Sequence, residues 1–541
     1  MKERLQDLIR ETLKSLNLRS VDFVVEHPVD LKMGDYSTNA GIKTGKAEKI
    51  LPHLEANLPS GVERAELAGP GFINFYLAKV FLKESLEEII KKGSEFGKNE
   101  SLKKQKTIIE YTDPNPFKEF HIGHMMSNVI GESLSRVIEW NGAEVKRVCY
   151  QGDVGIHVAK AVWGMLKGEK NPYPAGAMAY EENEVAKEEI KEINKKIYER
   201  NDDKINQIYD SGRKASLEEF DIIYKKLGTK FDFMFFESES GAFGRKVVEE
   251  NIGKVFEKSD GAIVFHAEKY NPHLHTRVFI NSEGLPTYET KELGIARIKL
   301  DKYPYTQSIV ITGNEINEYF KVVLEAMKQV FPELAEKTKH ISHGMLRLPT
   351  GKMSSRTGNV ITAEQLIEEV KNKVKGDEKV AIGAIKYIIL RQAIGNDIIF
   401  DIEKSVSTEG DSGVYLQYAY ARTNSLLEKA DQKIDINAPR ENTHEVERLL
   451  YRFPEVVERA GREYTPHYIT TYLTELAGSF NNFYAHEQII DDSPESPYRL
   501  AIVKAFNIVM KNGLTILGIP TPERIYFINM NFIIKICPCF S

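Results

Sequence analysis

The apolar residues in the middle of the chain form short runs separated by a stretch with helical spacing. Residues 106–111, Lys-Thr-Ile-Ile-Glu-Tyr, make an apolar, β-branched run that predicts a buried strand. Apolar side chains then recur at helical spacing over residues 125–138, which predicts a helix that stops near Asn141 and Gly142. Residues 145–150, Val-Lys-Arg-Val-Cys-Tyr, predict a second strand. This order indicates a βαβ unit in a parallel sheet.

The loop between the first strand and the helix carries the first chemical motif. Residues 113–124 read Asp-Pro-Asn-Pro-Phe-Lys-Glu-Phe-His-Ile-Gly-His, at the place where open parallel sheets bind ligands. The helix N-terminus offers free N–H groups to an anion, and His121 and His124 can donate to phosphate oxygens. Gly123 lets a nucleotide lie close to the backbone. The alternatives are a loop with two surface histidines or half of a metal site, which would need further ligands at short spacing.

A second motif follows far along the chain. Residues 351–358 read Gly-Lys-Met-Ser-Ser-Arg-Thr-Gly. Glycines flank two cations, Lys352 and Arg356, and two neutral donors, Ser354 and Ser355, which predicts a mobile loop that closes on phosphates. Alone, this string also fits a solvated basic turn. Together and in this order, the two motifs predict a site that holds ATP and reacts at its α-phosphate.

The remaining pattern divides the chain into segments. Residues 1–98 predict a small α+β domain, and residues 99–408 predict the nucleotide-binding fold, with a charged helical insertion near 180–228. Residues 409–525 carry aromatic and leucine stripes at helical spacing, which are typical of the core of a helical bundle. The atypical C-terminal tail, residues 526–541, is apolar and β-prone but too short to span a bilayer, and we expect no function for it.

Composition narrows the class of protein. A chain of 541 residues is long enough for three or more domains, and 42% hydrophobic with 28% charged residues is typical of soluble globular proteins. The net charge of −6 argues against a general polyanion binder, but a local basic face would still allow nucleic-acid binding. Three cysteines make no disulfide framework, so we expect a reducing cytoplasm. There is no apolar signal core and no run long enough for a membrane span, so we expect no membrane partner.

The two motifs resemble the paired signatures of class I aminoacyl-tRNA synthetases. Further strings resemble the arginyl-tRNA synthetases within that class, from about residue 20 to Arg524. They lie at residues 27–36 and 68–75 near the N-terminus, 285–293 in the middle, and 415–422 and 476–484 near the end. The resemblance implies an α/β fold: a Rossmann-like parallel-sheet catalytic domain, an N-terminal α+β domain and a C-terminal all-helical anticodon-binding domain.

The resemblance also implies a reaction in two steps. ATP, with Mg²⁺, and L-arginine form arginyl-adenylate and pyrophosphate, and the arginyl group then passes to the 3′-terminal adenosine of tRNA(Arg). Members of the family usually need bound tRNA even for the first step. We therefore expect tRNA(Arg), L-arginine and ATP as partners, no permanently bound cofactor, no protein metal site, and a monomer.

Roles for individual residues follow from the resemblance. His121, His124 and Lys352 are the expected catalytic residues. The expected ATP-binding residues are Lys118, Gly123, Ser354, Ser355 and Arg356. The expected arginine-binding residues are Asn115, at the α-amino or carboxylate end, Tyr288 and Glu292, facing the guanidinium, and Glu237 as a third candidate there. A carboxylate accepts the guanidinium fork in pairs, whereas a neutral or lysine-shaped ligand would leave it unpaired.

The chain departs from the family at several positions. The family commonly has Asp in place of Glu292 and Gln in place of Ile316, which puts the depth of the pocket and one polar contact in question. Many members compensate a degenerate second motif with a lysine near the first. This chain has both Lys118 and Lys352, so Lys118 need not carry the charge alone.

Three further residues lie close to the motifs. Asp153 follows the second strand and could reach the substrate, whereas a structural role is favoured for His157. For His343, contact with adenine and a packing role are equally compatible with the sequence. Three competing functions remain open. They are another class I synthetase, a small-molecule nucleotidyltransferase that uses the same loop, and a tRNA-binding paralogue without catalysis.

Overall fold

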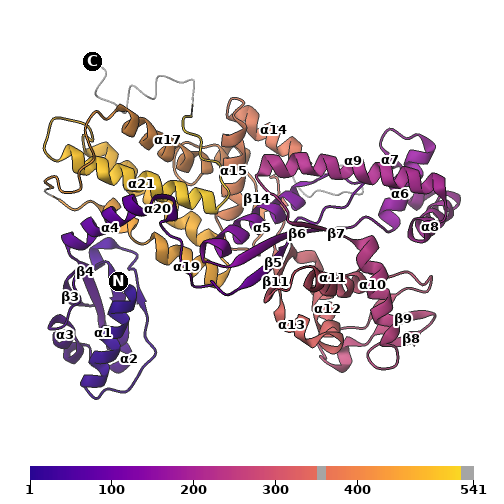
Figure 1. The fold of residues 1–541 in the computed structure, drawn as a ribbon, viewed down its shortest axis with the longest axis horizontal. Helices are drawn as coiled ribbons and strands as arrows, with labels where there is room; N and C mark the ends of the chain where they lie inside the picture. Colours follow the sequence, from indigo (N-terminus) through magenta and orange to yellow (C-terminus); the bar gives the residue numbers. More distant parts are fainter. Residues whose placement is uncertain (350–360, 441, 526–541) are drawn as a thin grey trace.

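The computed structural model describes residues 1–349, 361–440 and 442–525. Among them, a five-stranded parallel sheet in the order β12-β11-β5-β6-β7 forms the centre of the molecule (Figure 1). Its strands are β5 (Lys106–Glu110), β6 (Glu144–Gln151), β7 (Phe233–Phe236), β11 (Gln307–Gly313) and β12 (Thr338–His343). The sheet confirms the predicted parallel α/β fold. The chain runs outward from β5 in one direction and later returns to its other side, so the carboxyl ends of β5 and β11 form the topological switch point.

Helix α5 (Ile122–Trp140) connects β5 to β6 and lies where the sequence predicted a helix. Its apolar side chains are buried almost completely, and Ile108 and Ile109 of β5 are buried as well. Asn141 ends the helix, and Gly142 follows with a φ of 92°. The N-terminus of α5 is thereby set against the carboxyl end of the central strand.

Two segments are inserted between the strands of this sheet. Between β6 and β7 lie α6 (Ile156–Lys167), α7 (Pro172–Glu182), α8 (Glu184–Glu199) and α9 (Asp203–Leu227). They project from one end of the sheet and share a small apolar core of their own (Figure 1). Between β7 and β11 lie α10 (Glu237–Glu250), β8 (Glu257–Ser259), β9 (Ala262–Phe265), β10 (Arg277–Ile280) and α11 (Tyr288–Lys302). The three strands form an antiparallel sheet that the sequence pattern did not predict.

The rest of the nucleotide-binding region follows β11. It contains α12 (Asn317–Val330), α13 (Pro332–Lys337), β13 (Leu346–Arg347), α14 (Ala363–Lys373), α15 (Glu378–Leu390), β14 (Ile398–Ile399) and α16 (Ile402–Ser405). Strands β13 and β14 pair with each other in parallel.

The N-terminal part of the chain folds around its own core. Its four-stranded antiparallel sheet has the order β1-β2-β4-β3. The elements are α1 (Lys2–Ser15), β1 (Val25–Glu26), β2 (Tyr36–Thr38), α2 (Ala40–Thr44), α3 (Ala47–Glu55), β3 (Val62–Ala68), β4 (Phe72–Leu77) and α4 (Lys79–Lys92). Arg448 binds Asp35 at 2.8 Å, and the Tyr36 hydroxyl donates to Glu455 at 2.6 Å. These contacts dock the N-terminal unit on the C-terminal helices.

The C-terminal part is all-helical. It contains α17 (Gly413–Lys429), α18 (Glu445–Leu450), α19 (Phe453–Glu463), α20 (His467–His486) and α21 (Ser496–Ile516). Its apolar residues belong to the same continuous core as those of α5, α14 and α15. The bundle is therefore packed on the helix that follows the first motif. None of the described helices is long and apolar enough to cross a membrane.

The packing of α5 on β5 can be tested at Gly131. A Cβ atom there would lie 2.1 Å from Cγ of Tyr111, which is fully buried. Gly131→Ala should lower the free energy of unfolding by about 1–3 kcal/mol, because the ring or the helix must move. The matched control is Gly478→Ala in α20, where a Cβ meets nothing within 4 Å. It should raise stability by about 0.5–1 kcal/mol. Urea-unfolding midpoints measure both, and equal shifts would contradict this packing.

Candidate active site

His121 and His124 cap the N-terminus of α5 with their own rings. Nδ1 of His121 accepts the backbone N–H groups of Gly123 and His124, at 3.1 and 3.4 Å. Nδ1 of His124 accepts the backbone N–H of His121 at 3.3 Å. The two rings stack with centroids 3.6 Å apart. Because each Nδ1 acts as an acceptor, each neutral ring carries its proton on Nε2.

Burial keeps both rings neutral. Burial, followed by the nearby Lys118 ammonium, lowers the pKa of His121 to about 4. Burial, followed by His121 and Lys118, holds the pKa of His124 well below its ordinary value. At neutral pH the pair therefore presents two Nε2–H donors at a helix N-terminus, which is an arrangement suited to phosphate oxygens.

Lys118 lies beside this pair in the same loop. Burial lowers the pKa of its ammonium group, which lies 4.9 Å from the ring centroid of Tyr173 on α7. The preceding residue, Phe117, donates its backbone N–H to the Ser216 hydroxyl of α9 at 2.9 Å. The insertion between β6 and β7 therefore supports the loop that carries Lys118.

The turn after β5 has an unusual backbone. Thr112 and Asp113 have φ values of 83° and 45°, a region that residues other than glycine rarely adopt. Side chains hold this turn in place. The Thr112 N–H donates to the Ser127 hydroxyl at 2.9 Å, and the Tyr150 N–H donates to Oδ1 of Asp113 at 2.7 Å. The surrounding elements thus enforce a conformation that leads directly to Asn115.

Asn115 meets Glu237 across a glycine. A Cβ on Gly152 would lie 2.2 Å from Oδ1 of Asn115 and 3.3 Å from Oε1 of Glu237. Only glycine leaves room for both oxygen atoms, so Gly152, which follows β6, brings these two predicted site residues together. The sequence analysis did not single out Gly152 as part of the site.

The Glu237 carboxylate already has a cationic partner. Lys291 of α11 donates to it at 2.6 Å, and both side chains are buried. Burial raises the pKa of Glu237, and Lys291 opposes that rise. The sequence did not identify Lys291, although it lies between Tyr288 and Glu292. Tyr288 begins α11, is 57% exposed, and places its ring centroid 4.9 Å from Nζ of Lys291.

Glu292 lies among other acids. Its carboxylate accepts a long hydrogen bond, 3.5 Å, from the Tyr319 hydroxyl, and within the described residues it has no ion-pair partner. Lys299 pairs with Glu110 at 3.0 Å instead. Burial, followed by the Glu110 carboxylate, raises the pKa of Glu292 to about 8. Burial and Glu110 likewise raise the pKa of Asp113.

Glu110 is a residue of this cluster that sequence reasoning missed. It is the last residue of the central strand β5 and is only 2% exposed. An acid at the carboxyl end of a predicted buried strand beside the switch point was the signal that could have identified it. Tyr319 on α12 gave no such signal, because its contact with Glu292 joins residues that are distant in the sequence.

All residues of the second motif, 351–358, lie outside the described residues, including the predicted site residues Lys352, Ser354, Ser355 and Arg356. The residues that follow the second motif lie beside the first motif. Thr362 forms an isolated antiparallel β-bridge with His121, and the Ile122 N–H donates to the Ile361 carbonyl at 3.3 Å.

The three residues whose roles were open have local partners. Asp153 is fully buried and accepts two hydrogen bonds from Ser238, each 2.8 Å long, and pairs with Arg213 at 3.0 Å. It therefore ties α9 to α10. Nε2 of His157 contacts the Gly152 carbonyl at 2.9 Å, and Nδ1 of His343 contacts the Gly344 carbonyl at 2.7 Å. Within the described ranges, no group of three or more His, Cys, Asp or Glu side chains is placed to hold a metal ion.

Comparison with known proteins identifies the family. The family model described as "tRNA synthetases class I (R), catalytic domain" matches residues 85–380, which are more than half of the chain. The "Arginyl tRNA synthetase N terminal domain" matches residues 3–77, and the "DALR anticodon binding domain" matches residues 416–525. The fold and the site therefore define a class I aminoacyl-tRNA synthetase. Within that class, the chain belongs to the arginyl-tRNA synthetase family.

Individual relatives agree with this assignment. An arginine–tRNA ligase of Halothermothrix orenii is 30% identical over 566 residues, which cover 97% of this chain and 99% of the relative. The solved arginyl-tRNA synthetase of Thermus thermophilus is 23% identical, covers 97% of this chain and 100% of its own, and has a TM-score of 0.74. The Plasmodium falciparum enzyme is 20% identical, with 97% and 99% coverage and a TM-score of 0.78. These two structures have the same fold.

The protonation of His121 can be measured directly. Its ring should carry the proton on Nε2 and titrate near pH 4 instead of about 6.5. The unfolded chain binds this proton at a higher pH than the folded chain does. His121 should therefore lower the free energy of unfolding as the pH falls from about 6.5 to about 4. Long-range ¹⁵N–¹H spectra of histidine-labelled protein report both tautomer and pKa, and His121→Gln assigns the signal. An Nδ1–H tautomer, or a midpoint near 6.5, would contradict the capping arrangement.

Proposed function

We propose that this protein is an arginine–tRNA ligase, which activates L-arginine with ATP and transfers it to the 3′-terminal adenosine of tRNA(Arg). Membership of the family over nearly the whole chain supports this activity. The observation that carries the substrate assignment is the Glu292 carboxylate, a recessed acid without an ion-pair partner among the described residues. A guanidinium supplies the planar, permanently charged fork of donors that such a carboxylate lacks.

The two neutral histidines would act on ATP. In this proposal their Nε2–H groups donate to the α-phosphate as negative charge develops there, and the N–H groups of α5 and Lys118 add to that stabilisation. Gly123 leaves space for the nucleotide. Lys352, with Ser354, Ser355 and Arg356, would act on the pyrophosphate side. Mg²⁺ is commonly held by substrate phosphates together with few protein ligands, and we propose that it enters with ATP and offsets the phosphate charge.

The acids beyond β5 would hold the amino acid. Asn115 faces the α-amino or carboxylate end in this arrangement, while Glu292, with Tyr288 at the mouth, binds the guanidinium, and Glu237, which meets Asn115 at Gly152, is the third candidate there. Glu237 is already paired with Lys291, which favours Glu292 as the principal guanidinium ligand. Glu110 adds negative charge next to it.

The reaction needs only groups that these substrates bring. A carboxylate oxygen of arginine attacks the α-phosphorus, the bond to pyrophosphate breaks, and arginyl-adenylate forms. A ribose hydroxyl of the terminal adenosine then attacks the arginyl carbonyl, and AMP leaves. Positioning and charge stabilisation supply the rate, because no protein nucleophile is required.

The flanking regions would hold the tRNA. We propose that residues 1–98 and 409–525 bind it on either side of a catalytic region spanning 99–408, and that the protein acts as a monomer in the cytoplasm. Family matches to an N-terminal domain and an anticodon-binding domain support this division.

The proposal is tested by ATP–pyrophosphate exchange with each amino acid, with and without total tRNA. Arginine should support exchange, and tRNA should stimulate it. A neutral amino acid, or one with a shorter cation, would leave Glu292 unpaired at a cost of several kcal/mol, so exchange with lysine should be lower by roughly 10⁴-fold. Exchange with lysine or glutamate, or none with any amino acid, would overturn the assignment.

Arginine binding should depend on the protonation of Glu292. Burial and Glu110 hold the pKa of this carboxyl at about 8, but the guanidinium needs the ionised form. The KM for arginine should therefore fall by up to about tenfold per pH unit as the pH rises toward 8, and level off above it. Glu292→Gln should raise KM strongly and remove the slope. Glu289→Gln, which removes a neighbouring α11 acid paired with Arg277, is the control. An unchanged KM in Glu292→Gln would exclude Glu292 from the pocket.

A further inference from the structure

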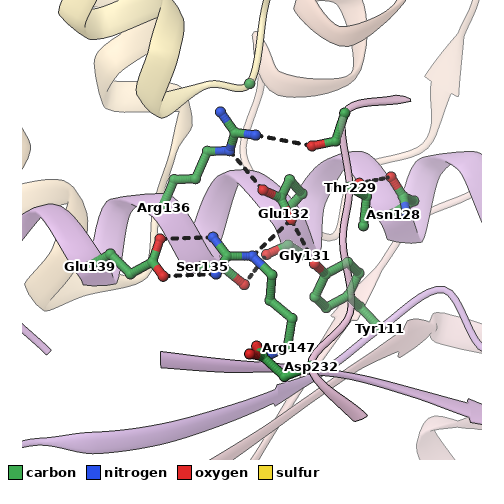
Figure 2. Close-up of polar contacts among 12 residues, drawn as sticks. Tyr111, Asn128, Gly131, Glu132, Ser135, Arg136, Glu139, Arg147, Thr229 and Asp232 are labelled. Atoms are coloured by element: carbon green, nitrogen blue, oxygen red, sulfur yellow. Dashed lines mark hydrogen bonds and ion pairs between the residues drawn. The ribbon is translucent and has the colours of Figure 1, made fainter. Parts of the chain in front are cut away.

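Glu132 is a buried acid in the middle of α5 with no part in the proposed chemistry. It is 3% exposed, and its two oxygen atoms have different partners (Figure 2). Oε2 accepts the Tyr111 hydroxyl at 2.7 Å and Nε of Arg147 at 3.0 Å. Oε1 accepts Nε of Arg136 at 2.7 Å. One carboxylate thus joins Tyr111, which follows the strand that leads to the active site, and the guanidinium of Arg136, one turn further along α5.

The first of these connections reaches the turn after β5. Tyr111 is fully buried, and its ring lies against Gly131 of α5. The next two residues, Thr112 and Asp113, are the ones with positive φ. A backbone held in that region persists only when its surroundings fix it, so the hydrogen bond from Tyr111 to Glu132 is one of the restraints that define the turn.

The second connection leaves the catalytic region. Nη1 of Arg136 donates to the Thr515 carbonyl at 2.9 Å, in the last turn of α21. Nη2 donates to the Gly228 carbonyl at 3.1 Å, at the C-terminal end of α9. The guanidinium therefore binds three different elements at once, and its planar, rigid geometry links their positions.

A second cation holds the same two helix ends. Lys386 of α15 is buried, and its ammonium donates to the carbonyls of Leu227 and Gly518, both at 2.7 Å. The C-terminal ends of α9 and α21 carry partial negative charge and carbonyls without partners inside their helices, so the two cations stabilise their close approach. These contacts keep the helical bundle and the insertion helix in a fixed relation to α5.

From this geometry we infer that Glu132 and Arg136 are positioning residues that couple the C-terminal bundle and α9 to the active-site turn at residues 111–113. A shift of α21 or α9 moves the Arg136 guanidinium, and with it the Glu132 carboxylate that restrains Tyr111. Helix α9 also contacts the loop of residues 113–124 directly, because Ser216 in the middle of α9 accepts the Phe117 N–H. The inference rests on the proposed function, because the shift to be transmitted is the one that tRNA would cause when it binds the bundle.

The test compares two arginine variants in arginine-dependent ATP–pyrophosphate exchange with and without tRNA(Arg). Arg136→Met removes the link to both helix ends, so stimulation by tRNA should fall by about tenfold through kcat, with tRNA binding unchanged in a filter assay. Arg147→Met is the matched control. It removes another guanidinium from Glu132, but the described hydrogen bonds of the Arg147 side chain reach only Glu132 and Glu139, not a carbonyl of α9 or α21. It should keep the stimulation.

A double-mutant cycle gives a second measure. Tyr111→Phe should lower tRNA stimulation, and adding Arg136→Met should lower it little further, because both changes break one chain of contacts. If Arg136→Met does not fold, Arg136→Lys keeps the charge but lacks the fork, and it should also lose stimulation. Three results would each overturn the coupling. They are equal loss in the Arg136 and Arg147 variants, additive effects in the cycle, and exchange by the unmodified protein that tRNA does not stimulate. The last result leaves the proposed function intact, whereas absence of arginine-dependent exchange with tRNA present would overturn the function itself.

Discussion

The attachment of α5 to the carboxyl end of β5 is the constraint on which the rest of the structure depends. It places a helix N-terminus, capped by two neutral imidazoles, at the switch point of the parallel sheet. The ring nitrogen atoms that cap the helix are unavailable for other bonds, so the remaining N–H groups face outward as donors. Local helix capping through Nδ1 therefore fixes the tautomer that leaves each Nε2–H group as a donor.

The acids near this point differ in whether they have a cationic partner. Two buried lysines of α11 are already engaged, Lys299 with Glu110 and Lys291 with Glu237. Burial and the nearby Glu110 carboxylate raise the pKa of Glu292, and the hydrogen bond from the Tyr319 hydroxyl opposes that rise only in part. An unpaired carboxylate in a recess is unfavourable until a cation arrives. In the proposed arginine site, the preference for a cation would come from the partner that the folded chain does not supply to Glu292.

The continuous core that joins the catalytic region to the helical bundle has a further consequence. Because α5 packs directly on the bundle, its residues can contact both the active-site turn and the ends of distant helices. Breaking only some hydrogen bonds of a polar network inside such a core costs free energy, because each broken bond leaves a buried group unsatisfied. That property makes Glu132 and Arg136 suitable for transmitting a displacement between regions.

The sequence by itself determined the elements that depend on local pattern. It predicted a strand at residues 106–111, a helix over residues 125–138 and the parallel α/β class, because apolar periodicity reflects burial on one face or both. The resemblance of its motifs to the family also placed His121, His124, Asn115 and Glu292 on one predicted site, and their roles remain predictions. The antiparallel sheet of β8–β10 and the contributions of Gly152, Glu110 and Tyr319 were decided only by tertiary structure. Those residues acquire their surroundings from partners far away in the chain, and neither hydrophobic periodicity nor a short motif records which distant charges and backbones a fold brings together.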